Sequence, residues 1–122
     1  MEFKNKKSIY LQIADYIAES ILRQEWQTNE KIPSIREIAA LLEVNPNTVT
    51  RTYAHLESHG IIKTHRGIGY FVTDEALPMI LHLKKEHFFR DALPELFRMV
   101  RLLNIDFNEI VALYKNERNN DE

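Results

Sequence analysis

Two helix-start signals placed close together constrain the fold of this chain more than any other feature. Ser34, with Glu37 three residues later, forms a capping box, in which both residues satisfy free N–H groups at the start of a helix. Asn45 is a strong N-cap, and Pro46 then falls at the first helical position, where its missing N–H costs nothing. Because the first of these helices ends near Glu43, the sequence predicts two helices joined by a tight turn, a helix-turn-helix.

Elements on both sides of this pair complete a larger motif. Upstream, a helix is predicted after Ser8, because apolar residues recur at helical spacing. They are Ile9, Ile13, Tyr16, Ile17 and Ile21. Downstream, Gly60 ends the third helix, and two β-prone runs at 61–65 and 70–73 flank a glycine-bearing turn at 66–69. Three helices followed by a hairpin predict a winged helix-turn-helix over residues 1–73.

Residues 74–122 have a different composition and predict a two-helix tail. One apolar stripe continues across Pro94, which indicates a kinked helix that does not end at the proline. A last helix is predicted after Asp106. The stripe holds more apolar side chains than the small core of one protomer needs, so we expect it to contact a second copy of the chain. Its members are Leu81, Phe88, Phe89, Leu93, Leu96, Phe97, Val100 and Leu103. The predicted fold class is mainly α with a small β-hairpin, a winged helix-turn-helix with a helical dimerisation tail.

The third helix has one side suited to reading a DNA major groove. At about 100° per residue, its residues divide into an inner and an outer face. The inner face holds Val49, Thr52, Tyr53 and Leu56, and the outer face holds Asn47, Thr50, Arg51 and Ala54. Arginine can bind guanine O6 and N7 together, and asparagine can bind adenine N6 and N7. The alternative is an ordinary helix face that contacts only solvent, and the helical spacing of these residues does not exclude it.

Two further places are candidate DNA contacts. The second helix opens with Ser34 and Arg36, and its free N–H groups can hold a phosphate. Arg66, Gly67 and Gly69 form the turn of the hairpin, where an arginine can enter a narrow minor groove. The alternatives are a capping box with a surface arginine, and a plain tight turn.

Charge gives this hypothesis little support. The net charge is −2. Residues 1–73 hold nine basic and eight acidic residues, which gives +1, and residues 74–122 hold seven and ten, which gives −3. A DNA-binding face is usually more basic than this. A winged-helix module that binds another protein and no DNA is therefore the alternative function.

Other function classes find less support. His55 and His59 have the spacing of metal ligands on a helix, with His65 as a conceivable third ligand of a small hydrolase. The run HLESH lacks the adjacent glutamate of the HExxH motif, and no catalytic constellation stands out, so we expect no enzyme, metal or cofactor. The chain has no cysteine, no apolar signal region at its N-terminus and no run of transmembrane length, and a cytoplasmic location is expected.

The run KIPSIREIAALLEVNPNTVTRTYAHLESHGIIKTHRGIGYFV resembles the N-terminal domain of GntR-type bacterial transcription regulators. The upstream IYLQIADYI resembles the first helix of that domain, and the NPNTV segment with the short tail resembles the YtrA subfamily. The resemblance in sequence covers about residues 8–73. The tail resembles the subfamily only in its size and its apolar pattern. It implies a homodimeric repressor that binds a palindromic operator, with transporter operons as frequent targets, and it leaves any small-molecule effector unidentified.

The resemblance also implies where DNA contacts lie. The matching positions are Ser34, Arg36, Asn45, Asn47, Thr48, Thr50, Arg51, Arg66, Gly67 and Gly69. This chain departs from the family at four places, one of them near Asn29, where glycine is common and asparagine tolerates the same left-handed conformation. The family often has arginines where Pro46 and Thr50 stand, so those contacts do not transfer. It usually has glycine where Glu43 stands, and a glutamate with positive φ costs roughly 1 kcal/mol.

Overall fold

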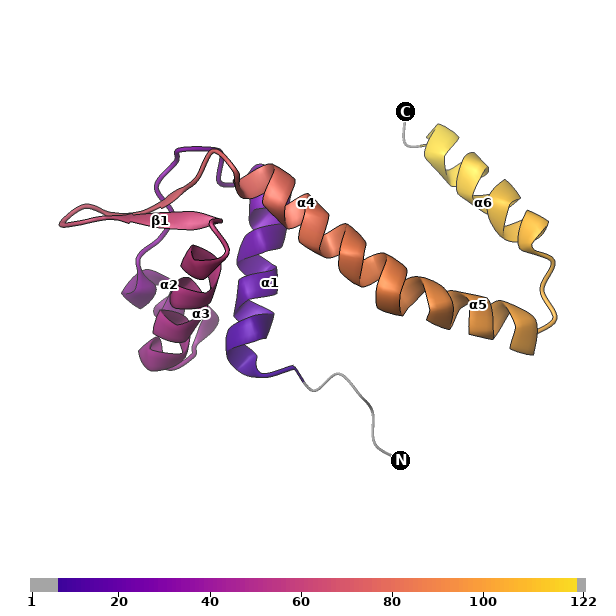
Figure 1. The fold of residues 1–122 in the computed structure, drawn as a ribbon, viewed down its shortest axis with the longest axis horizontal. Helices are drawn as coiled ribbons and strands as arrows, with labels where there is room; N and C mark the ends of the chain where they lie inside the picture. The colour runs from indigo at the N-terminus through magenta and orange to yellow at the C-terminus, as the bar shows by residue number, and fades with distance from the viewer. Residues whose placement is uncertain (1–6, 121–122) are drawn as a thin grey trace. The chain divides into compact units, whose positions relative to one another are not determined.

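The computed structural model describes residues 7–120, which run through the elements named in Figure 1. The first part contains α1 (Ile9–Leu22), α2 (Ile35–Leu42), α3 (Pro46–Ser58), β1 (Ile62–His65), β2 (Gly69–Val72) and α4 (Ala76–His87). Three helices followed by an antiparallel hairpin confirm the predicted winged helix-turn-helix. The chain forms two compact units that divide between Leu83 and Lys84, within α4. The structural division therefore lies further along the chain than the domain boundary predicted after Thr73.

The core of the first unit is built where α1 crosses α3. Ile17 of α1 and Val49 of α3 are fully buried, and Ala14 and Ala18 are small enough to let the two helices approach closely. The inner face predicted for α3 is confirmed, since all four of its residues are at most 2% exposed: Val49, Thr52, Tyr53 and Leu56. The prediction for α1 was partly wrong. Ile9 and Tyr16 are exposed, because the buried side is centred on Ile13, Ile17 and Ile21.

Tyr53 fixes α3 to the segment before α2. Its hydroxyl donates to the carbonyl oxygen of Pro33 at 2.5 Å, and its ring meets the Tyr70 ring edge-on at 4.8 Å. Burial raises the pKa of this phenol. The single side chain therefore links the helix-turn-helix to the hairpin, and the helix that carries the outer face is held from two sides.

The hairpin gains a third, very short strand that the sequence analysis missed. β1 and β2 pair from Ile62–Val72 to His65–Gly69. Ile32 donates its N–H to Tyr70, Val72 donates to Glu30, and Lys31 forms a bridge with Phe71. A single bridged residue has no alternating pattern, so periodicity does not reveal it. The pairing fixes the hairpin to the loop that precedes α2.

The turn between α2 and α3 has the strained backbone that the sequence predicts. Glu43 lies in the left-handed region at φ 55° and ψ 49°, and its N–H donates to Ala40. A side chain in this region costs roughly 1 kcal/mol. The tight turn is therefore formed at the expense of local strain.

Replacing Glu43 with glycine is expected to raise the free energy of unfolding by roughly 0.5–1 kcal/mol, because glycine adopts positive φ without the clash. Urea denaturation measures the change. Ala40→Gly in the adjacent α2 is the matched control, and it should lower the free energy of unfolding by about 1 kcal/mol. A loss of stability in both variants would contradict the strain assigned to Glu43.

The second unit is helical and has no buried core in its described residues. After the last turn of α4, residues Phe88–Ala92 form a π-helical turn (η1), and α5 (Leu93–Leu102) and α6 (Phe107–Asn120) follow. The π turn comes immediately before Pro94, whose missing N–H removes one helical hydrogen bond. The helix therefore continues across the proline, as the stripe predicts. Asp106 starts α6 by accepting from the Asn108 N–H, and not through a capping box with Glu109.

Candidate nucleic-acid interface

The outer face of α3 is present in the structure as the sequence predicts. Asn47, Thr50 and Arg51 are exposed, while the residues between and beside them, Val49 and Thr52, are buried. The face begins where the helix begins, because the Asn45 side chain accepts from the Asn47 N–H at 2.8 Å. One rigid helix thus presents an amide, a threonine methyl and a guanidinium on its first two turns.

Two threonines are predicted to contact DNA here, Thr50 on the outer face and Thr48 beside it, and the Thr50 hydroxyl is engaged within the protein. The Thr50 hydroxyl donates to the carbonyl of Pro46 at 3.1 Å, so it can only accept from DNA, or offer its methyl group to a thymine. Thr48 is half-buried, and its carbonyl accepts from the Thr52 hydroxyl. Thr50 therefore remains a predicted contact with a narrower chemistry than the sequence alone indicates, and Thr48 remains a predicted contact.

Arg51 lies against α1, a contact that the sequence analysis did not find. The central carbon of its guanidinium is 4.0 Å from the centre of the Tyr10 ring. Both side chains line a shallow surface hollow of about 380 Å³ between the start of α1 and the start of α3. The remaining lining residues are Ser8, Ile9, Asn47 and Thr48.

The start of α2 is a complete capping box. The Glu37 N–H donates to the Ser34 hydroxyl at 3.1 Å, and the Ser34 N–H donates to the Glu37 carboxylate at 2.8 Å. This backbone hydrogen bond, followed by the one from the hydroxyl, lowers the pKa of Glu37. The Ser34 hydroxyl therefore accepts in the cap and also faces the Glu37 carboxylate, and its contact with a phosphate stays a prediction. Arg36 follows on the exposed side of the first turn.

The wing turn separates the three residues predicted there. Arg66 and Gly67 are exposed, and Gly67 has φ of 79°, which favours glycine. Gly69 lies further back, in β2 opposite His65. A Cβ atom at Gly69 would fall 2.8 Å from Cε of Lys31, so glycine there keeps room for the lysine stem. Arg66 and Gly67 form the exposed tip, and Gly69 is favoured by its own φ of 144° whether or not it meets DNA.

The histidines of α3 are arranged as neighbours within the fold. The His55 and His59 rings are 4.5 Å apart, and Nδ1 of His59 is 3.0 Å from the His55 carbonyl oxygen. Burial, and then the nearby His59, lower the pKa of His55. His65 stacks edge-on against Phe71 in the hairpin. Among residues 7–120, no group of three His, Cys, Asp or Glu residues is placed to hold a metal ion.

The residues predicted to contact a second copy remain exposed or half-buried in the single chain. Those at least 37% exposed in the second unit are Phe88, Phe89, Leu96, Phe97 and Leu103. Leu93 and Val100 are half-buried, and Leu81, 44% exposed, belongs to the first unit. Within the second unit this apolar stripe is only partly covered, and the Phe97 ring meets the Phe107 ring of α6 at 6.2 Å.

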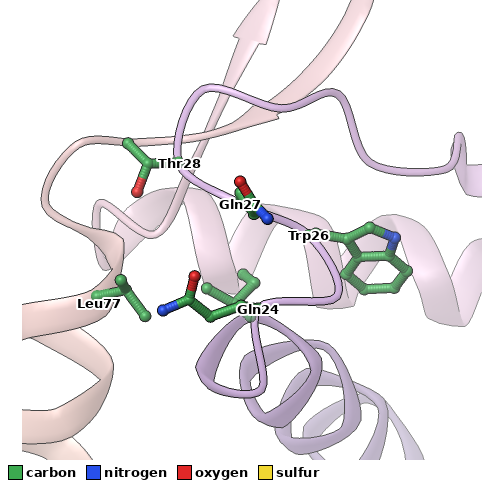
Figure 2. Close-up of a pocket in the computed structure, with 6 residues that line it drawn as sticks. Gln24, Trp26, Gln27, Thr28 and Leu77 are labelled. Carbon is green, nitrogen blue, oxygen red and sulfur yellow. The ribbon is translucent and has the colours of Figure 1, made fainter.

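The first unit also has a small pocket between the end of α1 and the start of α4. Figure 2 shows the Gln24 amide pointing toward Leu77. The pocket has a volume of about 150 Å³ and is lined by Ile21, Gln24, Trp26, Gln27, Thr28 and Leu77. Its walls therefore combine neutral hydrogen-bonding groups with apolar side chains. No helix in the described residues is long and apolar enough to cross a membrane.

Comparison with known proteins finds close relatives. The sequence profile of "Bacterial regulatory proteins, gntR family" matches residues 9–72. The HTH-type transcriptional regulator YhcF of Bacillus subtilis is 37% identical over 110 residues, which cover 90% of this chain and 89% of YhcF. The HTH-type transcriptional repressor YtrA of the same organism is 38% identical over 73 residues, 60% of this chain and 56% of YtrA. The crystal structure of a GntR-family regulator from Bacteroides thetaiotaomicron is 38% identical, has a TM-score of 0.76, and covers 94% of this chain and 100% of its own.

Proposed function

The chain belongs to the gntR family of bacterial regulatory proteins, and from this premise we propose that it is a repressor that binds a palindromic operator as a homodimer. The resemblance predicted from the NPNTV segment and the tail is confirmed, since a relative is named YtrA. The chain is a DNA-binding transcriptional regulator and not an enzyme. The operator, the dimer and repression itself are the proposal, as is action in the cytoplasm on transporter genes.

The observation that carries operator recognition is the outer face of α3. Asn47 and Arg51 are exposed on a helix whose opposite side is fully packed. Helices of this kind enter the major groove, where these two side-chain types distinguish adenine and guanine. Arg36 on α2 and Arg66 at the wing tip supply cations beside it. The other proposed DNA contacts rest on the resemblance to the family. They are Ser34, Asn45, Thr48, Thr50, Gly67 and Gly69.

Two observations support a homodimer. The second unit leaves a row of aromatic and aliphatic side chains uncovered, which a partner surface would bury. A dimer also doubles a DNA-binding face that is only modestly basic in one chain. Two such faces would contact half-sites about one helical turn apart on a palindromic site. Repression rests on the likeness to the repressor YtrA, and transporter control on the resemblance to its subfamily.

The alternative, a winged-helix module that binds only protein, is separated from this proposal by direct titration. A labelled duplex from the region upstream of the chain's own gene should change fluorescence anisotropy at lower protein concentration than a scrambled duplex of equal composition. Binding of neither duplex would favour the protein-interaction module, whereas equal binding of both would contradict recognition of an operator.

Arg36 is proposed to contact a phosphate, so Arg36→Ala should weaken binding to all duplexes alike. The slope of log affinity against log salt should become shallower by about 2, because the proposed homodimer loses one phosphate contact in each protomer. Arg36→Lys is the matched control, because it keeps the charge and should keep the slope. An unchanged slope in Arg36→Ala would exclude the phosphate role.

We also propose that a small-molecule effector binds in the pocket lined by Trp26. Two amides and a hydroxyl from Gln24, Gln27 and Thr28 suit a small neutral polar molecule. Trp26 is the only tryptophan of the chain, so its intrinsic fluorescence reports occupancy directly. A compound that changes this fluorescence but leaves operator affinity unchanged would be a ligand of the pocket and not an effector.

A further inference from the structure

The contact between Arg51 and Tyr10 joins the outer face of α3 to a helix outside the helix-turn-helix. The guanidinium carbon lies 4.0 Å from the centre of the ring, a stacking distance for a cation on an aromatic face. In residues 7–120, Arg51 makes no ion pair with a carboxylate. The tyrosine ring is thus the contact that orients this side chain.

Tyr10 is itself fixed to the turn of α3 that carries Arg51. Its carbonyl oxygen accepts from the Thr52 hydroxyl at 2.8 Å, and Thr52 is fully buried. The edge of its ring also meets His55, with the ring centres 5.9 Å apart. Because Thr52 and His55 lie one and four residues after Arg51 on α3, these two contacts hold Tyr10 next to the guanidinium.

Stacking orients an arginine without using its hydrogen-bond donors. A guanidinium laid flat on a ring keeps its five N–H groups in its own plane, and these remain available to guanine or phosphate. It also restricts a side chain that otherwise loses much rotamer freedom on binding. The ring and the guanidinium both line the surface hollow beside Asn47, so the oriented donors lie next to the second predicted base contact.

We propose that Tyr10 is a positioning residue for Arg51: its ring presents the guanidinium to DNA and so strengthens the operator preference that Arg51 provides. The inference rests on the proposed function and assigns to α1 a role in recognition beyond packing. It also explains why a single arginine on this face can be effective, since it is oriented before it meets DNA.

The test is a double-mutant cycle of Tyr10→Leu and Arg51→Ala, with Tyr10→Phe as the matched control. Neither change at Tyr10 touches the backbone oxygen that accepts from Thr52. Tyr10→Leu should weaken binding to a duplex enriched from a random library by about two- to fivefold, the range of an exposed cation–π contact. Binding to a scrambled duplex should hardly change. Tyr10→Phe should bind like the parent chain, and Tyr10→Leu should have no further effect once Arg51 is alanine.

Results that contradict the role of Tyr10 can be told apart from results that contradict the proposed function. Equal weakening by Tyr10→Leu with and without Arg51 would overturn the proposal, as would a Tyr10→Phe variant as weak as Tyr10→Leu. Thermal melting of each variant separates these results from loss of folding. A parent chain with no preference between duplexes would contradict the proposed function itself, whereas a parent preference that Tyr10→Leu leaves intact would contradict only the role of Tyr10.

Discussion

Replacing Arg51 with alanine should remove most of the preference for operator over scrambled DNA. A bidentate contact between arginine and guanine contributes about 1–3 kcal/mol of discrimination, and the proposed homodimer makes one in each half-site, so operator affinity should fall by roughly thirtyfold or more. Affinity for a scrambled duplex should fall far less, because that binding depends on the phosphates. Fluorescence anisotropy with both duplexes measures the two changes.

Arg23→Ala is the matched control for this prediction. Arg23 lies at the other end of α1 from Tyr10, exposed and paired with Glu25 at 2.9 Å, so its loss should leave operator preference unchanged. An unaltered ratio of operator to scrambled affinity in Arg51→Ala would show that α3 does not read bases through this residue. Asn47 and the wing would then be the remaining candidates.

The second large effect is expected in the tail. Phe89 and Leu103, 62% and 57% exposed in the single chain, should be covered in a dimer. Phe89→Glu with Leu103→Glu places two charges in that apolar contact, where an unpaired charge is strongly destabilising. The variant should be monomeric by light scattering at concentrations where the parent is dimeric. Operator affinity should fall by roughly a hundredfold or more, because one half-site is no longer coupled to the other.

Leu113→Glu in α6 is the matched control, because Leu113 is 67% exposed but lies outside the predicted stripe. It should stay dimeric and bind the operator normally. A dimeric Phe89→Glu, Leu103→Glu variant would show that the second copy contacts another surface. A variant that is monomeric but still binds the operator as the parent does would show that recognition does not need the dimer.

Local signals explain why much of the fold could be predicted from the sequence. A capping box at Ser34 and an Asn–Pro pair at 45–46 act within one turn of the chain, so both helices start where these residues stand. The strain at Glu43 was indicated by the resemblance, because the family usually has glycine at this turn, and Glu43 has positive φ there. The inner face of α3 follows from helical spacing alone.

The features that could not be predicted depend on how helices rotate against one another. Tyr10 and Arg51 are distant in sequence and meet only because α1 turns Ile9 outward and packs Ala14 and Ala18 inward. Apolar spacing in α1 did not distinguish these rotations. The Lys31 bridge was missed because it depends on a hairpin further along the chain.

Selection of bound duplexes from a random library by the intact chain tests the central claim most directly. Repeated rounds should enrich an inverted repeat, whose half-sites lie about one helical turn apart and contain the guanine that Arg51 contacts. The Arg51→Ala chain, selected in parallel, should lose preference at that base pair. No enriched sequence, or a single half-site without its inverted copy, would contradict operator binding by a homodimer.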